Sequence, residues 1–211
     1  MNMLSKLLAI ALSVSALTFA SAASAQEAPD ALVKRISEDV LNTAKSDKDI
    51  QAGNIGRIVA LVEEKILPYV DSERMTALAA GRYWRQATPE QQKQLMTEFR
   101  SLLIYTYSGA LSQVRDQKIE YKPLRADPAD TEVEVRSQVI QSRGEPIQLS
   151  YRLEKLATGW KLYDVNVMGA WLVEAYKGTF QSEITKGGID GLIKSLSDKN
   201  KQLAARSSAK K

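Results

Sequence analysis

The chain has 211 residues with 29 basic and 25 acidic side chains, for a net charge of +4, and it contains neither cysteine nor histidine. These absences exclude disulfides, thiol chemistry, Ser-His-Asp and Cys-His catalysis, the common zinc sites and haem ligation by histidine. The positive charge is small and basic residues are not interleaved with aromatic ones, so no nucleic-acid partner is indicated. We expect no catalytic residue, no metal and no cofactor.

The first 25 residues have the pattern of a secretory signal peptide. Lys6 supplies a positive charge, Leu7 to Phe19 form a largely apolar run, and Ala23-Ser24-Ala25 places small residues before Gln26. The apolar run has about 13 residues, whereas a membrane-spanning helix needs about 20. The pattern predicts cleavage after residue 25 and a single domain over residues 26–211. The basic end of that domain is expected to be frayed from about residue 200.

Apolar residues at helical spacing follow in the first half of the remaining chain. They predict helices over 32–41 and 55–66, and a short helix from Asp71 to Gly81. The sequence Thr88-Pro89-Glu90-Gln91 is a capping box and predicts the start of a longer helix. From Leu102 to Tyr107 this helix is apolar or aromatic on almost every side. It therefore needs cover on more than one side, from the core, a second helix, a partner or a ligand.

After Val114 the apolar period changes from 3.6 to 2 residues, which indicates strands. Four alternating runs joined by short polar turns, at 119–121, 133–139, 147–153 and 160–167, predict an antiparallel meander with one apolar face. The alternation slips at Tyr163 and Asp164, which predicts a β-bulge. Two more helices follow, on either side of Gly187-Gly188. The fold class is therefore α+β, with helices laid across one face of a four-stranded antiparallel sheet.

Two stretches carry a family resemblance. One is Gly81 to Gln91 (GRYWRQATPEQ); the other is Trp160 to Val165 (WKLYDV), followed by Gly169, Leu172, Val173, Tyr176 and Phe180. Together they resemble the signature of the MlaC family of periplasmic phospholipid-binding proteins, also called toluene-tolerance proteins. The resemblance covers nearly all of residues 26–211.

The resemblance implies a cone-shaped fold like that of nuclear transport factor 2, with a deep apolar pocket that holds phospholipid acyl chains as cargo. It further implies a periplasmic location and two partners. One is an outer-membrane lipoprotein complex, and the other is an inner-membrane ABC transporter complex with its periplasmic lipid-binding component. A carrier shuttling between them would maintain the lipid asymmetry of the outer membrane.

Aliphatic strand positions and aromatic or aliphatic helix positions are the candidates for lining such a pocket. We expect lipid-binding residues among Phe99, Leu103, Tyr107, Val133, Val135, Leu149, Tyr151, Leu153, Val165, Val167, Tyr176 and Phe180. Periodicity alone would place any one of them in an ordinary core. The three tyrosines are candidates for the mouth, because the ring packs on acyl chains while the hydroxyl meets water or a headgroup. Tryptophan at Val135 or Leu149 is expected to fill the pocket without unfolding the protein.

Two alternatives remain open. An enzyme of the ketosteroid-isomerase kind would share the fold and could use Asp164 beside Tyr163 as acid and base. Otherwise Asp164 marks the bulge or a hydrogen bond at a strand end. A ligand-free periplasmic adaptor would have the same apolar residues packed into a solid interior.

Overall fold

The first half of the chain is helical, as predicted. The computed structural model describes residues 26–208, so the predicted signal peptide lies outside the described residues. The helices are α1 (Pro29–Ser46), α2 (Lys48–Gln51), α3 (Ile55–Lys65), α4 (Ser72–Ala80) and α5 (Pro89–Ser112). Two 3₁₀ segments, Leu67–Tyr69 and Gly81–Gln86, flank α4. The short helix α2 and both 3₁₀ segments have too few residues to show a helical period in the sequence.

The helix starts follow the capping residues. The side chain of Asp71 accepts a hydrogen bond from the backbone N–H of Arg74 at the start of α4. At the start of α5 the capping box is complete: the Thr88 hydroxyl accepts from the N–H of Gln91, and the Gln91 side chain accepts from the N–H of Thr88. Each contact satisfies a backbone donor that has no partner within the helix. The predicted starts of both helices are therefore confirmed.

The second half opens with the sheet. Its strands are β1 (Lys118–Tyr121), β2 (Glu132–Ile140), β3 (Ile147–Leu156), β4 (Gly159–Val167) and β5 (Ala170–Trp171), and they pair antiparallel in chain order. The four-stranded meander is confirmed, but the strand count is corrected to five. Strand β5 was missed because two residues are too few to show an alternation. A tight turn connects β4 to β5. In this turn Met168 (φ 53°) and Gly169 (φ 92°) both take left-handed backbone angles.

The predicted β-bulge lies in β4. Arg152 of β3 pairs with Asp164, and the next residue, Leu153, pairs with Leu162, so Tyr163 has no opposite residue. One extra residue on one strand shifts the side-chain alternation by one position. That shift puts Trp160, Leu162, Val165 and Val167 on the same face of the sheet despite their mismatched spacing.

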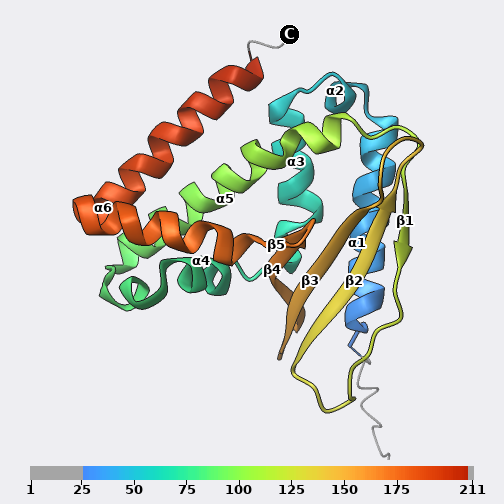
Figure 1. Cartoon of the computed structure of the whole chain (residues 1–211), viewed down its shortest axis with the longest axis horizontal. Helices are drawn as coiled ribbons and strands as arrows, with labels where there is room; N and C mark the ends of the chain where they lie inside the picture. Colours follow the sequence, from blue (N-terminus) through green and yellow to red (C-terminus); the bar gives the residue numbers. More distant parts are fainter. Residues whose placement is uncertain (1–25, 209–211) are drawn as a thin grey trace, which may run out of the picture.

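Two helical arms close the chain. Helix α6 (Leu172–Ser208) bends at Gly187 and Gly188, where the angles leave the helical region and Gly188 has a φ of 68°. Figure 1 shows the two arms as a sharp V beside α5. The prediction of two helices at these glycines is confirmed. The prediction of a frayed tail from about residue 200 is wrong up to Ser208, because the helix continues and Asn200 is buried against α5, where it donates to the Glu98 carbonyl at 2.9 Å.

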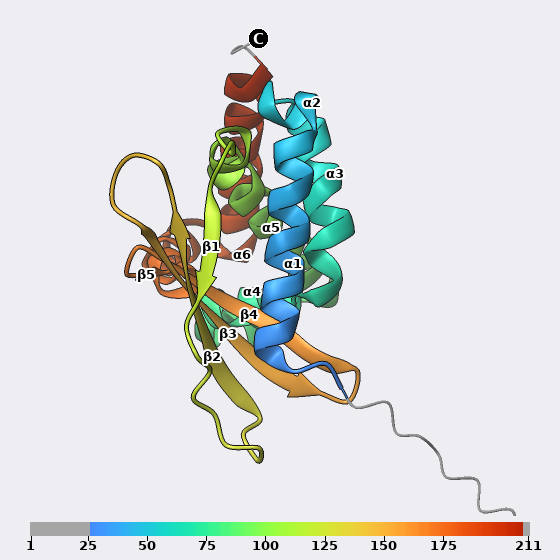
Figure 2. The same cartoon turned by 90° about the vertical axis from the view of Figure 1, so that its right-hand side faces the viewer.

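Three clusters of buried apolar side chains hold these elements together. The first joins α4, α5 and α6, and the second joins α1, α2, α3 and the end of α5. The third joins α1 to one face of the sheet through Leu32, Val33, Val135, Leu153 and Trp160. Figure 2 shows α1 running along that face. The α+β class is confirmed. Helix α1 covers the apolar face of the sheet around Val135, Leu153 and Trp160.

Candidate functional site

The second half of α5 carries no charge. From Ser101 to Val114 no residue is acidic or basic, although more than a quarter of the whole chain is charged. Several of these side chains stay partly open to solvent: Leu103, Ile104 and Tyr105 are half-buried, and Tyr107 is 38% exposed. Exposing such an apolar surface to water costs free energy, so a surface of this kind is typical of a binding site for a ligand or a partner protein.

The sheet presents a matching apolar surface. Val165 and Val167 of β4 pair with Tyr151 and Leu149 of β3, so these four side chains share one face. It is the face that α1 covers further along, since Tyr151 in turn pairs with Val135. All four are half-buried, whereas Val135 is only 1% exposed. The apolar face is therefore closed by α1 at one end and left partly open at the other.

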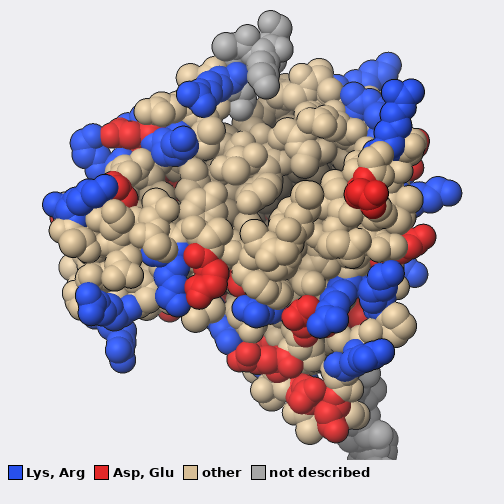
Figure 3. Space-filling view, in the orientation of Figure 1, with Lys and Arg blue, Asp and Glu red and all other residues tan. Residues whose placement is uncertain are grey.

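A hollow separates these two surfaces. In Figure 3 charged side chains lie around the rim of the molecule, and the centre of the face is an uncharged, hollowed area over α5 and the adjoining end of the sheet. Leu149, Val165, Val167, Ile104 and Tyr107 belong to none of the three packed clusters. Their partial exposure is consistent with a space that the protein's own side chains do not fill.

A small polar group lies among these apolar residues. The hydroxyls of Ser137 and Tyr151 are 3.3 Å apart, and the hydroxyl of Tyr121 donates to the Lys34 carbonyl at 3.4 Å. Burial raises the pKa of Tyr151, and it raises the pKa of Tyr121 to about 12. Both rings therefore stay neutral at physiological pH and can donate or accept a hydrogen bond inside the apolar environment.

The structure divides the twelve predicted lipid-binding residues into three sets. Phe99, Tyr176 and Phe180 form an edge-to-face aromatic group between α5 and α6, and Leu103 packs against it. Val133, Val135 and Leu153 lie in the cluster under α1, with Tyr151 at its margin. Leu149, Val165, Val167 and Tyr107 are half-buried or exposed and belong to none of the three clusters. Of the three tyrosines proposed for the mouth, Tyr107 is the most exposed.

Asp164 and Tyr163 make separate polar contacts. Asp164 is 2% exposed and accepts from the N–H groups of Val165 and Val173, at 2.9 and 3.1 Å. Burial raises the pKa of Asp164, while the two N–H donors and Arg152, at 3.6 Å, act in the opposite direction. The residue thus joins the bulge to the first turn of α6, as the structural interpretation of its position predicted.

Tyr163 takes part in a cluster that sequence reasoning missed. Arg74 of α4 donates to Glu154 at 2.5 Å and to Glu132 at 2.6 Å, and its guanidinium lies 3.8 Å from the centre of the Tyr163 ring. The Tyr163 hydroxyl donates to Glu132 at 3.0 Å. We call Arg74, Glu132, Glu154 and Tyr163 the Arg74 clamp. It joins α4 to the sheet face opposite α1, and only the strand pairing of Glu132 with Glu154 could have suggested it.

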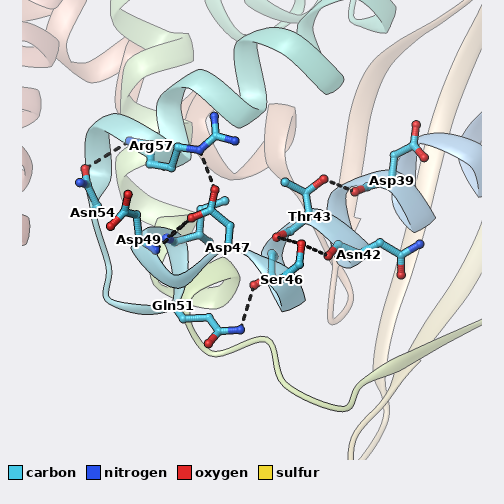
Figure 4. Close-up of polar contacts among 11 residues, drawn as sticks. Asp39, Asn42, Thr43, Ser46, Asp47, Asp49, Gln51, Asn54 and Arg57 are labelled. Atoms are coloured by element: carbon cyan, nitrogen blue, oxygen red, sulfur yellow. Dashed lines mark hydrogen bonds and ion pairs between the residues drawn. The ribbon is translucent and has the colours of Figure 1, made fainter.

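A second polar cluster, drawn in Figure 4, is a structural corner. The side chain of Asp47 accepts from the N–H groups of Asp49 and Ile50 at the start of α2, and its second oxygen pairs with Arg57 at 2.7 Å. Asn54 caps α3. These groups satisfy one another's hydrogen bonds and hold α1, α2 and α3 together at this corner.

Two absences among the described residues bear on the kind of site. Within residues 26–208 no helix combines the length and apolar character needed to cross a membrane. In the same part of the chain no cluster of acidic side chains could hold a metal ion.

The comparisons with known proteins agree with this arrangement. A structure of the phospholipid-binding protein from Ralstonia solanacearum, in complex with a phospholipid, is 50% identical with a TM-score of 0.80, and the match covers 83% of this chain and 98% of that one. The toluene tolerance protein Ttg2D of Pseudomonas putida is 25% identical over 167 residues, 79% of this chain and 77% of the relative. The intermembrane phospholipid transport system binding protein MlaC of Haemophilus influenzae is 24% identical over 172 residues, 80% of each chain.

The family model described as MlaC protein matches residues 34–198, which is most of the described chain. It includes α5, all five strands and the first arm of α6. This chain therefore belongs to the MlaC family.

Proposed function

We propose that this protein is a periplasmic phospholipid carrier that encloses acyl chains in the hollow between α5 and the sheet. The observation that carries the proposal is the facing pair of uncharged, partly exposed surfaces, one on α5 and one on β3 and β4. The phospholipid in the Ralstonia solanacearum structure supports it, because that chain is 50% identical to this one.

The need for such a hollow follows from the cargo. A phospholipid with two tails carries roughly 30 methylene groups, and exposing each to water costs about 0.8 kcal/mol, on the order of 24 kcal/mol in total. A lipid therefore does not cross an aqueous compartment unaided. A carrier must replace the membrane with apolar surface, yet bind weakly enough to release its cargo. A largely featureless apolar lining with few polar groups meets both requirements.

We assign the acyl chains to the residues around the hollow. Leu149, Val165 and Val167 would contact them from the sheet and Tyr107 from α5, where the half-buried Leu103 lies one turn earlier, at the margin of the closed aromatic group. Tyr151, beside Ser137, would offer a hydroxyl to the ester region of the lipid. The buried aromatic group of Phe99 and Phe180 would support α5 and α6 rather than touch the lipid.

The proposed location and partners follow from the family and from residues 1–25. The predicted signal peptide would export the chain to the periplasm. There it would receive and deliver phospholipid at an outer-membrane lipoprotein complex and at an inner-membrane ABC transporter complex with its lipid-binding component. The name of the Haemophilus influenzae relative, a binding protein of an intermembrane phospholipid transport system, supports this assignment. Its result would be the maintenance of outer-membrane lipid asymmetry.

Mass spectrometry of the bound lipid tests the proposal. The exported protein is purified without detergent, extracted with organic solvent, and the extract is quantified against the protein. We expect phospholipid in a stoichiometric amount. No phospholipid in the extract, together with no uptake of an apolar fluorescent probe, would favour a ligand-free adaptor and refute the carrier.

The enzymatic alternative needs a separate measurement. If Asp164 were a catalytic base, the purified protein would show isomerase-type activity that Asp164→Asn abolishes. We expect no such activity, because both N–H contacts of Asp164 are structural and the Tyr163 hydroxyl donates to Glu132 instead.

A further inference from the structure

A second depression lies on the opposite face of the same strands. It has a volume of about 620 Å³ and is lined by Lys122, Pro123 and Arg125 after β1, and by Arg136, Ser137, Gln148, Leu149 and Ser150 on β2 and β3. Arg136 pairs with Ser150, and the adjacent pair, Ser137 with Leu149, points to the other face. The Arg136 and Ser150 side chains therefore meet this depression, which we call the outer groove, on the face opposite the hollow, and Ser137 and Leu149 lie between the two.

The outer groove is lined by charge of one sign. Among its lining residues three are basic and none is acidic. Lys122 and Arg125 are exposed, and neither forms an ion pair with any residue of 26–208. Arg136 pairs with Glu134 at 2.7 Å, but the arginine side chain remains 66% exposed. Each can therefore meet an incoming anion.

The floor of the outer groove is ordered by hydrogen bonds. Gln148 donates to the Gln138 side chain at 3.2 Å, and Gln138 donates to Glu120 at 2.6 Å. Another depression, at the bend of α6, differs in kind. It is lined by both signs of charge, and its Lys194 and Asp198 pair with each other at 2.5 Å. The excess of positive charge thus distinguishes the outer groove from the depression at the bend of α6.

We propose that the outer groove is the docking site for an acidic segment of a partner protein. Carboxylates would pair with Lys122, Arg125 and Arg136, while Gln148 and Ser150 would hydrogen-bond to the segment. The size of the groove favours a peptide over free phosphate, because ligand pockets of about 300–1,000 Å³ enclose molecules of drug or short-peptide size.

The position of the outer groove suits a carrier. A partner held there leaves the hollow free, so lipid can enter or leave while the two proteins stay in contact. Ser150 and Leu149 are neighbours on β3 and both line the outer groove, while the Leu149 side chain points to the face of the sheet that borders the hollow. This advantage rests on the proposed function, whereas the charge and shape of the outer groove do not.

A binding experiment with a defined probe tests the proposal. A labelled peptide of about eight Glu and Asp residues is titrated with the full protein at low salt, beside a Gln/Asn peptide of the same length. The test variant is Lys122→Glu/Arg125→Glu. The control is Lys48→Glu/Lys93→Glu, which changes the net charge equally at two exposed lysines away from the outer groove. We expect the test variant to lose affinity by about tenfold or more and the control by about twofold or less.

The remaining outcomes decide against the proposal. Equal losses in both variants would show attraction to net charge alone, and equal binding of both peptides would show that charge is not recognised. Full competition by inorganic phosphate, or groove-dependent binding to phosphatidylglycerol vesicles without peptide binding, would assign the outer groove to another anion. Co-purified phospholipid and circular dichroism are measured in both variants. Unchanged lipid with lost peptide binding separates this proposal from the carrier function.

Discussion

Two regions of this protein contain the same kinds of apolar residue and use them differently. Between α4, α5 and α6 the side chains are closed against one another: Phe99 and Phe180 are 1% and 0% exposed, with ring centres 4.9 Å apart. The second region lies between α5 and the end of the sheet that α1 leaves uncovered. There Leu149, Val165 and Val167 stay half-buried and Tyr107 is 38% exposed. One helix, α5, takes part in both regions.

The difference shows how an apolar sequence becomes either a core or a site. Protein interiors are close-packed, so two apolar surfaces that approach each other exclude all other molecules. Where the elements diverge, the same surfaces leave space for a guest molecule. The variants below test this contrast, starting with the largest expected effect.

Phe180→Ala should be the most destabilising change. Phe180 is fully buried and contacts Phe99 edge to face, so truncation leaves a cavity in a closed region. We expect a loss of about 3–5 kcal/mol in the free energy of unfolding, measured by urea titration. The phospholipid bound per folded molecule should not change. A stable variant that had lost its lipid would place Phe180 in the site rather than in the core.

Arg74→Met should come next, because the Arg74 clamp joins the closed region to the sheet. The Glu154 side chain is only 15% exposed, and the variant leaves its carboxylate without its cation. We expect a loss of about 2–3 kcal/mol in the free energy of unfolding. Arg74→Lys keeps the charge but cannot reach both carboxylates as a fork, so it should retain part of the stability. A Met variant as stable as the wild type would contradict this role.

Val135→Trp and Leu149→Trp should separate the two kinds of apolar position. Val135 is 1% exposed under α1, so the larger ring should cost about 1–3 kcal/mol through overpacking. At the half-buried Leu149 the ring can enter the hollow. That variant should lose less than about 1 kcal/mol and carry less phospholipid, as measured by mass spectrometry of the extracted protein. The opposite pattern would mean that the hollow has been assigned to the wrong end of the sheet.

The pH dependence of the Arg74 clamp should be the smallest effect. The hydrogen bond from Arg74 lowers the pKa of Glu132 from its ordinary 4.5. The stabilisation is therefore complete above pH 4.5 and is lost as the pH falls through the lower, folded-state value. Because the Glu132 side chain is 54% exposed, we expect about 1 kcal/mol or less.

Unfolding titrations at neutral and at acidic pH measure this effect. Glu132→Gln should show a weaker loss of stability on acidification than the wild type. Asp164 acts with the opposite sign, since burial raises its pKa and its protonation favours the folded state as the pH falls. An unchanged acid dependence in the Gln variant would exclude Glu132 as its source.

Much of the architecture follows from local sequence. The capping residues Asp71 and Thr88 mark helix starts, and Gly187-Gly188 marks the bend in α6, because caps and left-handed angles depend on a few neighbouring residues. The slip at Tyr163 predicts the bulge for the same reason. The frayed tail was wrongly predicted because the contact of Asn200 with Glu98 joins residues about a hundred positions apart.

The candidate site divides along the same line. The sequence by itself determines that Leu149, Val135 and Phe180 are apolar and face inward, since that depends only on the helical and strand periods. Only the tertiary structure decides that Phe180 meets a ring, that Val135 meets α1 and that Leu149 stays half-buried. The physical reason is distance along the chain: periodicity assigns a side chain to a face, but the approach or divergence of remote elements decides whether that face is filled.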